Sequence, residues 1–552
     1  VSVIVEFKTL PAKVAVKQQL LLGKQKAVTN AEQQVEASHK SFSTFISSMK
    51  KKKSIDKFDA NKLEIIHEYK HAFNGVSMTL PGTAVQSLLA SDEVKRIWSN
   101  KEIKLDIPSE DEKVSPKMAD SVPQIGVDQL HDEKIKGEGI KVGVIDTGID
   151  YNHPDLMDAY KGYRYTDGEN PAEVEPSSVK GWDFVDNDAD PMETTYEDWV
   201  ENGEGYPEEY GGATYYTSHG THVSGTIAAN PNNTVDYAVT GVAPEVDLYN
   251  YRVLGPYGSG SNEDVMAGID KAVADEMDVM NLSLGTSVND PLDPTSIAIN
   301  QAMLSGVVAV VAAGNAGPDE KTLGSPGTAA LGITVGASDS DMSIPTLDVT
   351  VKGQKLSLML LAKNFSDKLA LLEGKELPIV EAGIGQETDF QGLDVKGKIA
   401  LIERGTLTFD EKIKHAKDAG AIAVIIYNNE EGQIPSYLGE GSEYLPSFRL
   451  SKEDGEKLKA SGVNKITLTN LDETTTEGDH LADFSSRGPV NGNYDIKPDV
   501  VAPGVAIFST IPEYINSPEE GVAYDNAYAR MQGTSMATPH VAGAAAIVMQ
   551  FI

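Results

Sequence analysis

Residues 140–146 read IKVGVID, an apolar run that ends in the carboxylate of Asp146. A continuous apolar run of this length is typical of a strand buried on both faces of a parallel sheet. Further apolar runs lie at 246–253, 277–284, 307–313 and 332–337, and helical patterns lie at 219–229, 261–275 and 294–305. Apolar strands separated by helices predict a parallel sheet with helices on both faces, an α/β/α arrangement.

The sequence before this region has a different character. Residues 1–107 combine short strand patterns with helical stretches near 13–50 and 83–92, which predicts a small α+β domain. Residues 108–121 are polar and contain two prolines, so we expect an exposed linker that is open to cleavage.

A β-rich stretch at 346–472, with one helical pattern near 409–419, interrupts the α/β/α unit. We expect an inserted domain there, so that the unit consists of 122–345 and 473–552. Its second part ends in a helix that begins near Ser535.

The acidic composition excludes whole classes of partner. The 552 residues carry a formal net charge of −36 at pH 7, of which residues 1–117 contribute +5 and the rest −41. Nucleic acids and anionic membrane surfaces need clustered basic side chains, so neither is an expected partner. The two oppositely charged parts should attract each other.

Two absences from the sequence narrow the chemistry. The chain has no Cys, which excludes disulfides, thiolate metal sites and a Cys nucleophile. No run approaches 18 apolar residues, so no membrane span is predicted. The chain starts with a strand pattern, and we expect any export signal to have been left out of it.

Asp146 and two histidines are the first candidates for chemistry. Ligands gather at the carboxyl ends of strands in an open α/β sheet, so Asp146 could orient a partner; the alternative is an Asp that only caps a turn. SHGTHVSGT at 218–226 opens a helix with His219 and His222 one turn apart. As metal ligands they lack the spacing and the Glu of a metalloprotease helix. A buried structural His or a general base are the other readings.

A serine and an asparagine complete the candidates. GTSMATPHVAG at 533–543 presents Ser535 at a helix start, where Ser is often only an N-cap. Together with an Asp and a His at other element ends, it becomes the candidate nucleophile of a triad. AAGNAGP at 312–318 places Asn315 after a strand, as a turn former or as a hydrogen-bond donor to an oxyanion.

In this order, the motifs VIDTGID, SHGTHVSGT, AAGNAGP and GTSMATPHVAG closely resemble those of the subtilisin-like serine proteases, the subtilases. The likeness continues through SVPQIGVDQL, GVAPEVDLYNYRVLGPYGSGS and ADFSSRGP. It is greatest to the minor extracellular proteases of bacilli that carry a protease-associated domain. The resemblance implies a subtilisin-like three-layer α/β/α fold and a secreted serine endopeptidase of broad specificity.

The resemblance also implies roles for the candidates. Asp146 would hold the imidazole of His219, which would take the proton of Ser535 and later protonate the leaving amine. Asn315, with the backbone N–H of Ser535, would stabilise the oxyanion. Two edge strands would pair with an extended substrate, and a third segment would line the pocket for the residue before the scissile bond. These substrate contacts would be Tyr257, Gly258, Ser259, Gly260 and Ser261; Leu282, Ser283, Leu284 and Gly285; and Ala312, Ala313 and Gly314.

Residues 1–107 are similar to the inhibitory propeptides of subtilases, most clearly in AFNGVSMTLPGTAVQSLLASDEVKRIW. This implies a folding assistant and inhibitor whose tail lies in the active cleft until self-cleavage between about Lys104 and Ser121, nearer 118–120. An independent adaptor domain is the alternative. The insert resembles protease-associated domains, which implies gating of substrates or protein binding; a spacer beside the cleft is the alternative.

No cofactor is expected for the chemistry itself, and metal sites would be structural. Asp155 matches a calcium-ligand position of many subtilases, although the loop at 230–240 departs from the family pattern. A second candidate is the series Asp186, Asp188 and Asp190 with Glu197, spaced as in an EF-hand loop. Pro191 stands where that loop needs Gly, so an acidic solvated loop is the alternative.

Two other function classes are weighed against a protease: a catalytically silent peptide-binding relative and a metal-dependent hydrolase on a similar sheet. The intact set of Asp146, His219, Asn315 and Ser535 gives the first no support. We expect a monomer that acts on proteins and peptides and on its own propeptide. Subtilase domains normally continue beyond the serine helix, so we expect further sequence after Ile552.

Overall fold

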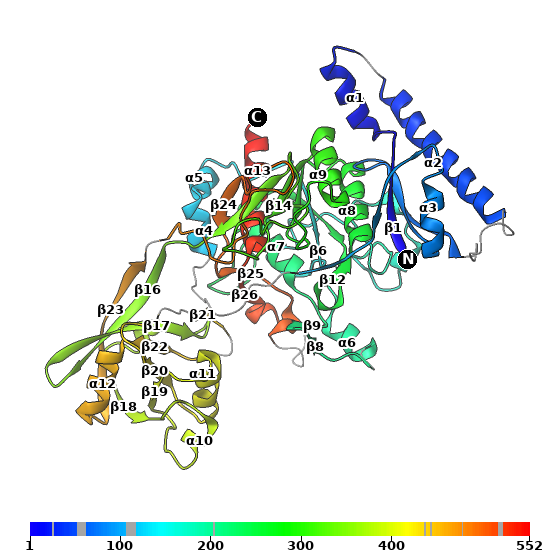
Figure 1. Ribbon diagram of the computed structural model, residues 1–552. Helices are drawn as coiled ribbons and strands as arrows, with labels where there is room; N and C mark the ends of the chain where they lie inside the picture. The colour runs from blue at the N-terminus through cyan, green and yellow to red at the C-terminus, as the bar shows by residue number, and fades with distance from the viewer. Residues whose placement is uncertain are drawn as a thin grey trace.

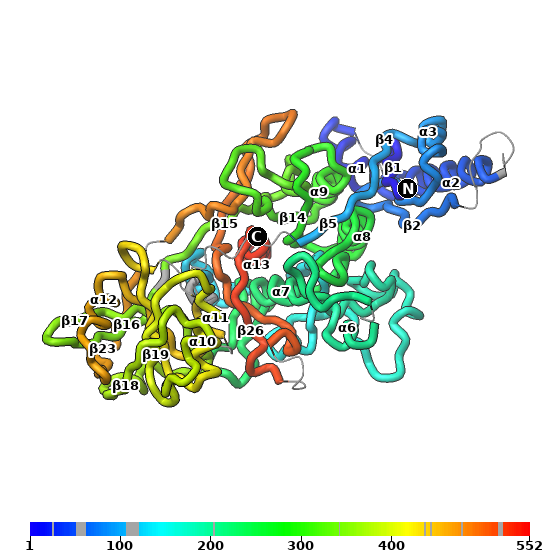
Figure 2. Tube along the Cα trace, turned by 60° about the horizontal axis from the view of Figure 1, so that its bottom comes forward, coloured from blue at the N-terminus to red at the C-terminus, as the bar shows by residue number. Residues whose placement is uncertain are grey.

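The computed structural model describes residues 1–24, 27–51, 62–105, 118–202, 205–434, 438–441, 444–476, 478–516 and 523–552. The amino-terminal domain (residues 1–105, blue in Figure 1) and the insert (residues 342–476, yellow-green to orange) lie on opposite sides of a central α/β/α unit. Figure 2 shows the same arrangement from a second direction. No helix in the described ranges is long and apolar enough to cross a membrane.

The central unit is built on a seven-stranded sheet in which all neighbours are parallel. The predicted α/β/α arrangement is therefore confirmed, and the apolar runs of the sequence form its central strands. In sheet order the strands are β24 (Val500–Pro503), β15 (Ile333–Ser338), β14 (Val308–Ala312), β13 (Val279–Leu282), β6 (Lys141–Asp146), β10 (Asp247–Arg252) and β7 (Trp182–Asp183).

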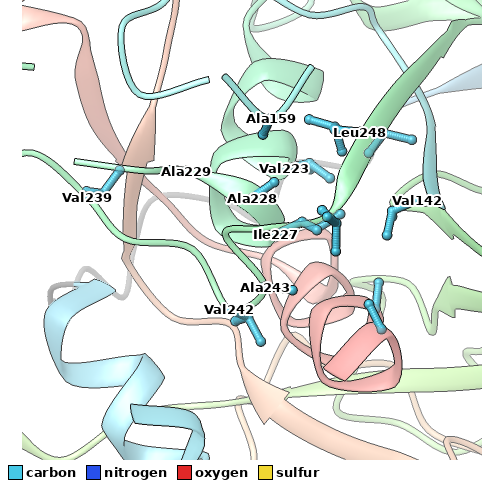
Figure 3. Packing of buried hydrophobic residues seen from close by; sticks show 14 of the residues in the cluster. Val142, Ala159, Val223, Ile227, Ala228, Ala229, Val239, Val242, Ala243 and Leu248 are labelled. Atoms are coloured by element: carbon cyan, nitrogen blue, oxygen red, sulfur yellow. The ribbon is translucent and has the colours of Figure 1, made fainter. Parts of the chain in front are cut away.

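Helices cover both faces of this sheet, and successive residues of β6 face opposite cores. Val142 and Val144 pack with helices α7 (His219–Ala228) and α13 (Thr534–Phe551), as part of the core seen in Figure 3. Ile145 packs with α8 (Asn262–Ala274) and α9 (Pro294–Ser305) on the other face. Burial on both faces explains why this strand is a continuous apolar run instead of an alternating one.

Shorter elements complete the central unit. The helices are α4 (Met118–Gln124), α5 (Val127–Asp132) and α6 (Tyr196–Asn202). The strands are β8 (Glu209–Tyr210), β9 (Ala213–Thr214), β11 (Leu254–Gly255), β12 (Ser259–Ser261), β25 (Ile507–Thr510) and β26 (Tyr528–Met531).

The amino-terminal domain is an antiparallel four-stranded sheet backed by helices. The strand order is β2 (Glu64–Tyr69), β3 (Gly75–Thr79), β1 (Ser2–Phe7) and β4 (Val94–Ser99). The helices are α1 (Ala12–Leu21), α2 (Val28–Lys51) and the short α3 (Val85–Leu88). The single helix predicted over 13–50 is wrong. Gly23 has a φ of +69°, which ends α1 in a left-handed turn that the apolar pattern does not reveal.

The amino-terminal domain is bound tightly to the face of α8. The Asp270 carboxylate accepts the backbone N–H groups of residues 70–73 at 2.7 to 3.2 Å. His67 pairs with Asp264 at 3.1 Å, and Phe73 joins the apolar core around α8. Hydrogen-bond donors of this domain thus meet carboxylates of the central unit.

The insert contains an eight-stranded mixed sheet, which begins and ends a few residues outside the expected 346–472. Its strands are β16 (Met342–Val351), β17 (Gln354–Lys363), β18 (Glu376–Glu381), β19 (Ile399–Glu403), β20 (Ala423–Tyr427), β21 (Gly439–Glu440), β22 (Ser447–Leu450) and β23 (Lys465–Thr476). Beside the predicted helix α11 (Phe409–Asp418) it has α10 (Glu387–Phe390) and α12 (Lys452–Ser461), which the sequence pattern did not predict.

The insert is anchored to the central unit by an ion pair and a stacked ring. Glu440 hydrogen-bonds Arg530 of β26, and both side chains are buried. Lys363 lies 3.7 Å from the same carboxylate. Phe365 stacks on Tyr237 with ring centres 4.8 Å apart. A buried ion pair together with an aromatic contact fixes the orientation of the insert.

Candidate active site

Asp146 and His219 meet at the carboxyl edge of the sheet. Asp146 ends β6 and is fully buried, and His219 begins α7. The distance from His219 Nδ1 to Asp146 Oδ1 is 2.8 Å, and the same oxygen accepts the backbone N–H of Thr147 at 2.7 Å. A carboxylate only accepts hydrogen bonds, so it assigns the proton of the neutral imidazole to Nδ1. Nε2 is then the basic atom of the ring.

The electrostatic surroundings suit His219 as a base. Burial lowers the pKa of His219, but the charge of Asp146, its hydrogen bond and the charge of Glu193 together raise that pKa above the usual 6.5. A raised pKa makes the imidazole a stronger proton acceptor than an ordinary histidine side chain.

Ser535 lies in the first turn of α13 and faces the same cavity as His219. Both residues line a cavity of about 490 Å³, called the first cavity below. Ser535 is 7% exposed, and its hydroxyl donates to the carbonyl of Ser283 at 3.0 Å. The hydroxyl of Ser283 in turn donates to the carbonyl of Ser535 at 2.8 Å. These two bonds fix the start of α13 against the segment that follows β13.

Asn315 follows β14 and lies on the other side of Ser535. Its Oδ1 accepts the backbone N–H and the hydroxyl of Thr534 at 2.8 and 3.0 Å. The amide is therefore held in one orientation, with its NH₂ group on the side away from Thr534. Asn315 and Ser535 both line a second cavity of about 470 Å³. An amide donor that shares a cavity with the candidate nucleophile could bind an oxyanion there.

The predicted substrate edge at 257–261 is paired with the chain's own tail. Strand β5 (Glu102–Lys104) runs antiparallel to β12, with Ile103 opposite Gly260. The N–H of Leu105 donates to the carbonyl of Gly258 at 3.1 Å, and Leu105 lines both cavities together with Ser535. The tail of the amino-terminal domain therefore lies along the edge as an extended peptide would.

The other predicted substrate residues divide between the cleft and the core. Leu284 and Gly285 line the second cavity beside the tail, and Ala312 and Gly314 line it beside Asn315. Leu282 ends the central strand β13, between β6 and β14, so it is not on an edge. Ala313 is fully buried, and its N–H donates to Val335.

His222 is a structural residue of the core. Its Nε2 lies 2.8 Å from the carbonyl of Ile507 and 3.2 Å from that of Ala529, so this nitrogen is a donor. Burial, with a smaller contribution from the charge of His219, lowers the pKa of His222 to about 3. His222 therefore ties α7 to the hairpin of β25 and β26. This contact does not suit a metal site with His219.

Asp155 is surrounded by hydrogen-bond donors. Its Oδ1 accepts the N–H of Asn233 at 2.8 Å, and its Oδ2 accepts the hydroxyl of Tyr528 at 2.7 Å and the N–H of Val239 at 3.2 Å. A calcium ion would need oxygen ligands in these places, so the residues present do not fit one at this carboxylate. Within the described ranges, no three His, Asp or Glu side chains are arranged to hold a metal ion.

The acidic series that is spaced as in an EF-hand loop is paired with a positively charged side chain of the protein. The guanidinium of Arg252, which is buried, binds the carboxylates of Asp183 and Asp186. Asp188 accepts the N–H of Asp190 at 2.8 Å, and Asp190 accepts the hydroxyl of Tyr151 at 2.8 Å. These contacts favour the alternative of an acidic loop without a metal.

Some residues of the site were not predicted from the sequence. Tyr444 and Glu440 of the insert form part of the wall of the first cavity, and Glu193 binds residues on both sides of His219. Glu193 is one of many acids in the stretch 186–198, and nothing in the pattern distinguishes it. Arg252 could have been singled out from the sequence, because a charged residue inside an apolar strand needs a buried partner.

The chain matches two family models and several known proteins. The family model described as "Subtilase family" matches residues 137–552, and that of "Peptidase inhibitor I9" matches residues 2–106. The chain is 41% identical over 96% of its length to the minor extracellular protease Vpr of Bacillus subtilis, of which it covers 60%. It is 31% identical over 76% of its length to a PII-type proteinase of Lacticaseibacillus paracasei, of which it covers 23%. It is 32% identical over 76% of its length to a C5a peptidase of Streptococcus pyogenes, of which it covers 35%.

The chain thus spans less than two thirds of the length of these relatives. The matched segments include the parallel sheet, the Asp146–His219 pair, Asn315 and Ser535, and a separate segment covers the amino-terminal domain with its tail. The chain belongs to the subtilase family and carries an inhibitor domain of the I9 type at its amino-terminal end.

Proposed function

We propose that this protein is a secreted serine endopeptidase in zymogen form, which hydrolyses peptide bonds of proteins through Asp146, His219 and Ser535. The observation that carries this proposal is the 2.8 Å contact between His219 Nδ1 and the Asp146 carboxylate. His219 also lines the same cavity as Ser535. Secretion is inferred from the extracellular relative in Bacillus subtilis. We further expect a monomer and no metal-dependent step in the reaction.

The reaction begins when the hydroxyl of Ser535 turns from the carbonyl of Ser283 toward His219. Oγ attacks the scissile carbonyl carbon while Nε2 of His219 takes the hydroxyl proton, and the carbonyl π pair moves onto oxygen. Asn315 and the backbone N–H of Ser535 bind this oxyanion. When the tetrahedral intermediate collapses, His219 gives the proton to the leaving amine and an acyl ester remains on Ser535. Water then attacks the acyl ester with His219 again as the base, and the carboxylic acid product leaves Ser535.

Broad specificity follows from the way in which an extended chain is held. The tail binds β12 by backbone pairing at residues 259–261, and backbone groups are the same in every peptide. Main-chain hydrogen bonds thus supply affinity, and pockets for alternate side chains supply a preference. We therefore propose proteins and peptides in general as substrates.

The amino-terminal domain would act as a folding assistant and as an inhibitor that is removed by self-cleavage. Its tail reaches the cleft at Leu105, so we expect the first cut shortly after Leu105. The prediction of a cut nearer 118–120 falls where α4 begins, and residues 106–117 lie outside the described ranges. Amino-terminal sequencing of the activated protein distinguishes the two positions.

The insert would shape the half of the cleft that receives the leaving side of the substrate. Leu438, Gly441 and Tyr444 line the first cavity together with His219, which protonates the leaving amine. The ion pair between Glu440 and Arg530 holds this wall in place. Because the insert lines the cavity itself, a gating role is favoured over that of a spacer beside the cleft.

Replacement of the nucleophile tests the proposal. Full-length Ser535→Ala protein should stay at full mass, whereas the parent chain loses the amino-terminal domain; self-processing of the variant at the parent rate would contradict the triad. Phenylmethylsulfonyl fluoride should inactivate the processed parent with an adduct on Ser535, and EDTA should not stop the chemical step. Active enzyme with an unmodified Ser535 would instead favour a metal-dependent hydrolase. A folded but inactive parent would favour a silent peptide-binding relative.

A further inference from the structure

Glu193 is a buried carboxylate directly behind the catalytic histidine. It is 2% exposed and lies in the loop before α6. Its Oε1 accepts the backbone N–H of Thr221 at 2.8 Å and the hydroxyl of Thr221 at 2.9 Å. Its Oε2 accepts the hydroxyl of Thr217 at 2.6 Å. The two threonines lie two residues before and two residues after His219, so one carboxylate holds both sides of this segment.

The contact with Thr221 also caps the first turn of α7, where the hydroxyl of Thr147 accepts the N–H of Gly220 at 2.8 Å. The first N–H groups of a helix have no partner within the helix. Ser218 is the N-cap residue of α7, but its side chain makes no capping hydrogen bond. Glu193 supplies an acceptor from another part of the chain, and its negative charge lies at the positive end of the helix dipole. The start of α7, where His219 lies, is therefore held by an anion.

The loop that carries Glu193 is itself fixed to the same segment. The N–H of Thr217 donates to the carbonyl of Thr194 at 2.9 Å, and the N–H of Thr194 donates to the hydroxyl of Thr217 at 3.0 Å. The hydroxyl of Tyr514 is shared between the carbonyls of Thr194 and Thr217, at 3.1 and 3.0 Å. Arg252 donates to the hydroxyl of Thr194 at 2.8 Å. Glu193 is thus part of a rigid brace.

We propose that Glu193 is a positioning residue for the general base, a second carboxylate that holds the His219 segment and acts on the imidazole through its charge. The inference rests on the proposed function, because it assigns Glu193 a role in the same proton transfer. Asp146 contacts the ring directly, whereas Glu193 acts on it from behind the helix start. The reaction itself would be unchanged, since Glu193 touches neither the substrate nor the reacting atoms.

Several ionisable groups surround this pair and enter its pH dependence. His219 is affected by Asp146 and Glu193, and it lowers in turn the pKa of His222. Burial raises the pKa of the Glu193 carboxyl; hydrogen bonds from Thr217, Thr147 and Thr221 oppose this, and Asp146 adds to it. Asp150 and Tyr514 also interact with Glu193.

Replacement of Glu193 by Gln tests the charge. The anion stabilises imidazolium, so its loss should lower the pKa of His219 and move the acid limb of the pH profile of kcat/KM to lower pH. A shift of several tenths of a pH unit is expected for the loss of a charge that acts on the imidazole without touching it. Asp198→Asn is the matched control, because Asp198 follows Glu193 closely in the chain but is not among the charges acting on His219. Its acid limb should stay at the parent position.

A second variant tests the same charge if E193Q does not fold. Thr217→Val removes a hydrogen bond that lowers the pKa of the Glu193 carboxyl. The carboxyl then takes up a proton at higher pH, and the acid limb should again move to lower pH. The pH dependence of Ser535 modification by phenylmethylsulfonyl fluoride gives the same readout without turnover. An unshifted limb in a folded, active E193Q or T217V protein, even with a lowered rate, would overturn the proposal. Absence of any serine-dependent hydrolysis in the parent would instead overturn the proposed function.

Discussion

Ser535 has a different hydrogen-bond partner at rest from the one that it needs for attack. Its hydroxyl donates to Ser283, and the rotation toward His219 is about a single side-chain bond. The Ser283 hydroxyl and the Asn315 side chain hold the start of α13 through the backbone of Ser535 and Thr534. In the proposed mechanism, the nucleophile would therefore be placed by main-chain contacts and activated by a rotamer change.

Asn315→Ala should remove one of the two oxyanion donors and leave substrate binding largely intact. In subtilisin, a member of the same family, the loss of such a donor costs about 10² to 10³ in kcat, and we carry this figure over. Steady-state kinetics on a peptide substrate should show the loss in kcat, with little change in KM. Asn491→Ala, at an exposed position, is the matched control and should behave as the parent does. A variant that retains parental kcat would refute the oxyanion role.

The elements around the cleft depend on backbone geometry that side chains cannot replace. Gly260 of β12 faces Ile103 of the tail in the antiparallel register. A Cβ built on Gly260 would lie 2.3 Å from the carbonyl oxygen of Val253, so any other residue must push β12 out of place. The edge that holds extended peptides thus requires glycine at this position.

Gly260→Ala should therefore weaken the binding of extended substrates. The loss of one or two strand hydrogen bonds, each worth about 0.5 to 1.5 kcal/mol, corresponds to roughly a tenfold rise in KM. A minimal ester substrate that does not reach β12 should be affected much less. Ser259→Ala leaves the neighbouring backbone unchanged and serves as the control. Equal losses on long and minimal substrates would argue against pairing at this edge.

Helix α8 holds the amino-terminal domain mainly through Asp270. Asp270→Asn keeps the shape of the side chain but loses the charge that binds four backbone N–H groups. Charge-assisted hydrogen bonds contribute about 1.5 to 3 kcal/mol, so inhibition by a separate segment 1–105 should weaken about tenfold to a hundredfold. Glu276→Gln, exposed just beyond the same helix, should not change the inhibition constant. Unchanged inhibition of the D270N enzyme would show that the apolar contacts suffice.

The strands and helices of the central unit could be predicted because burial on both faces leaves an unmistakable apolar pattern. Asp146, Asn315 and Ser535 could be proposed because each is a polar group at the end of such an element. The break after α1 depends on a single glycine conformation, and the short helix α10 lacks a periodic apolar face. Glu193 and the insert wall depend on contacts between segments far apart in the chain, which local patterns do not encode.

At the scale of the whole molecule, the cleft lies where the three parts of the chain come together. Leu105 of the amino-terminal domain, His219 of the central unit and Tyr444 of the insert all line the first cavity. The inhibitor and the insert therefore approach the catalytic residues from separate directions, and removal of the tail leaves the insert wall in place.

Glu440→Gln should loosen this wall. Breaking one side of a buried ion pair costs about 3 to 5 kcal/mol, because the remaining charge on Arg530 loses its partner. The midpoint of thermal unfolding should fall, and cleavage of a peptide library should show weaker selection among residues after the scissile bond. The neutral double variant Glu440→Gln/Arg530→Gln is the control, because it also removes the unpaired charge of Arg530, and it should recover part of both effects. A parental cleavage pattern in folded E440Q would show that the insert does not select substrates.

Arg252 gives the acidic loop a counterion that belongs to the chain itself. A bound metal is exchanged with the surroundings, and its occupancy varies with dilution, competing ions and sequestering agents. A guanidinium attached through the backbone of β10 is present in every copy at all times, and it is lost only when the sheet unfolds. At this loop the charge balance should therefore not depend on the metal content of the medium.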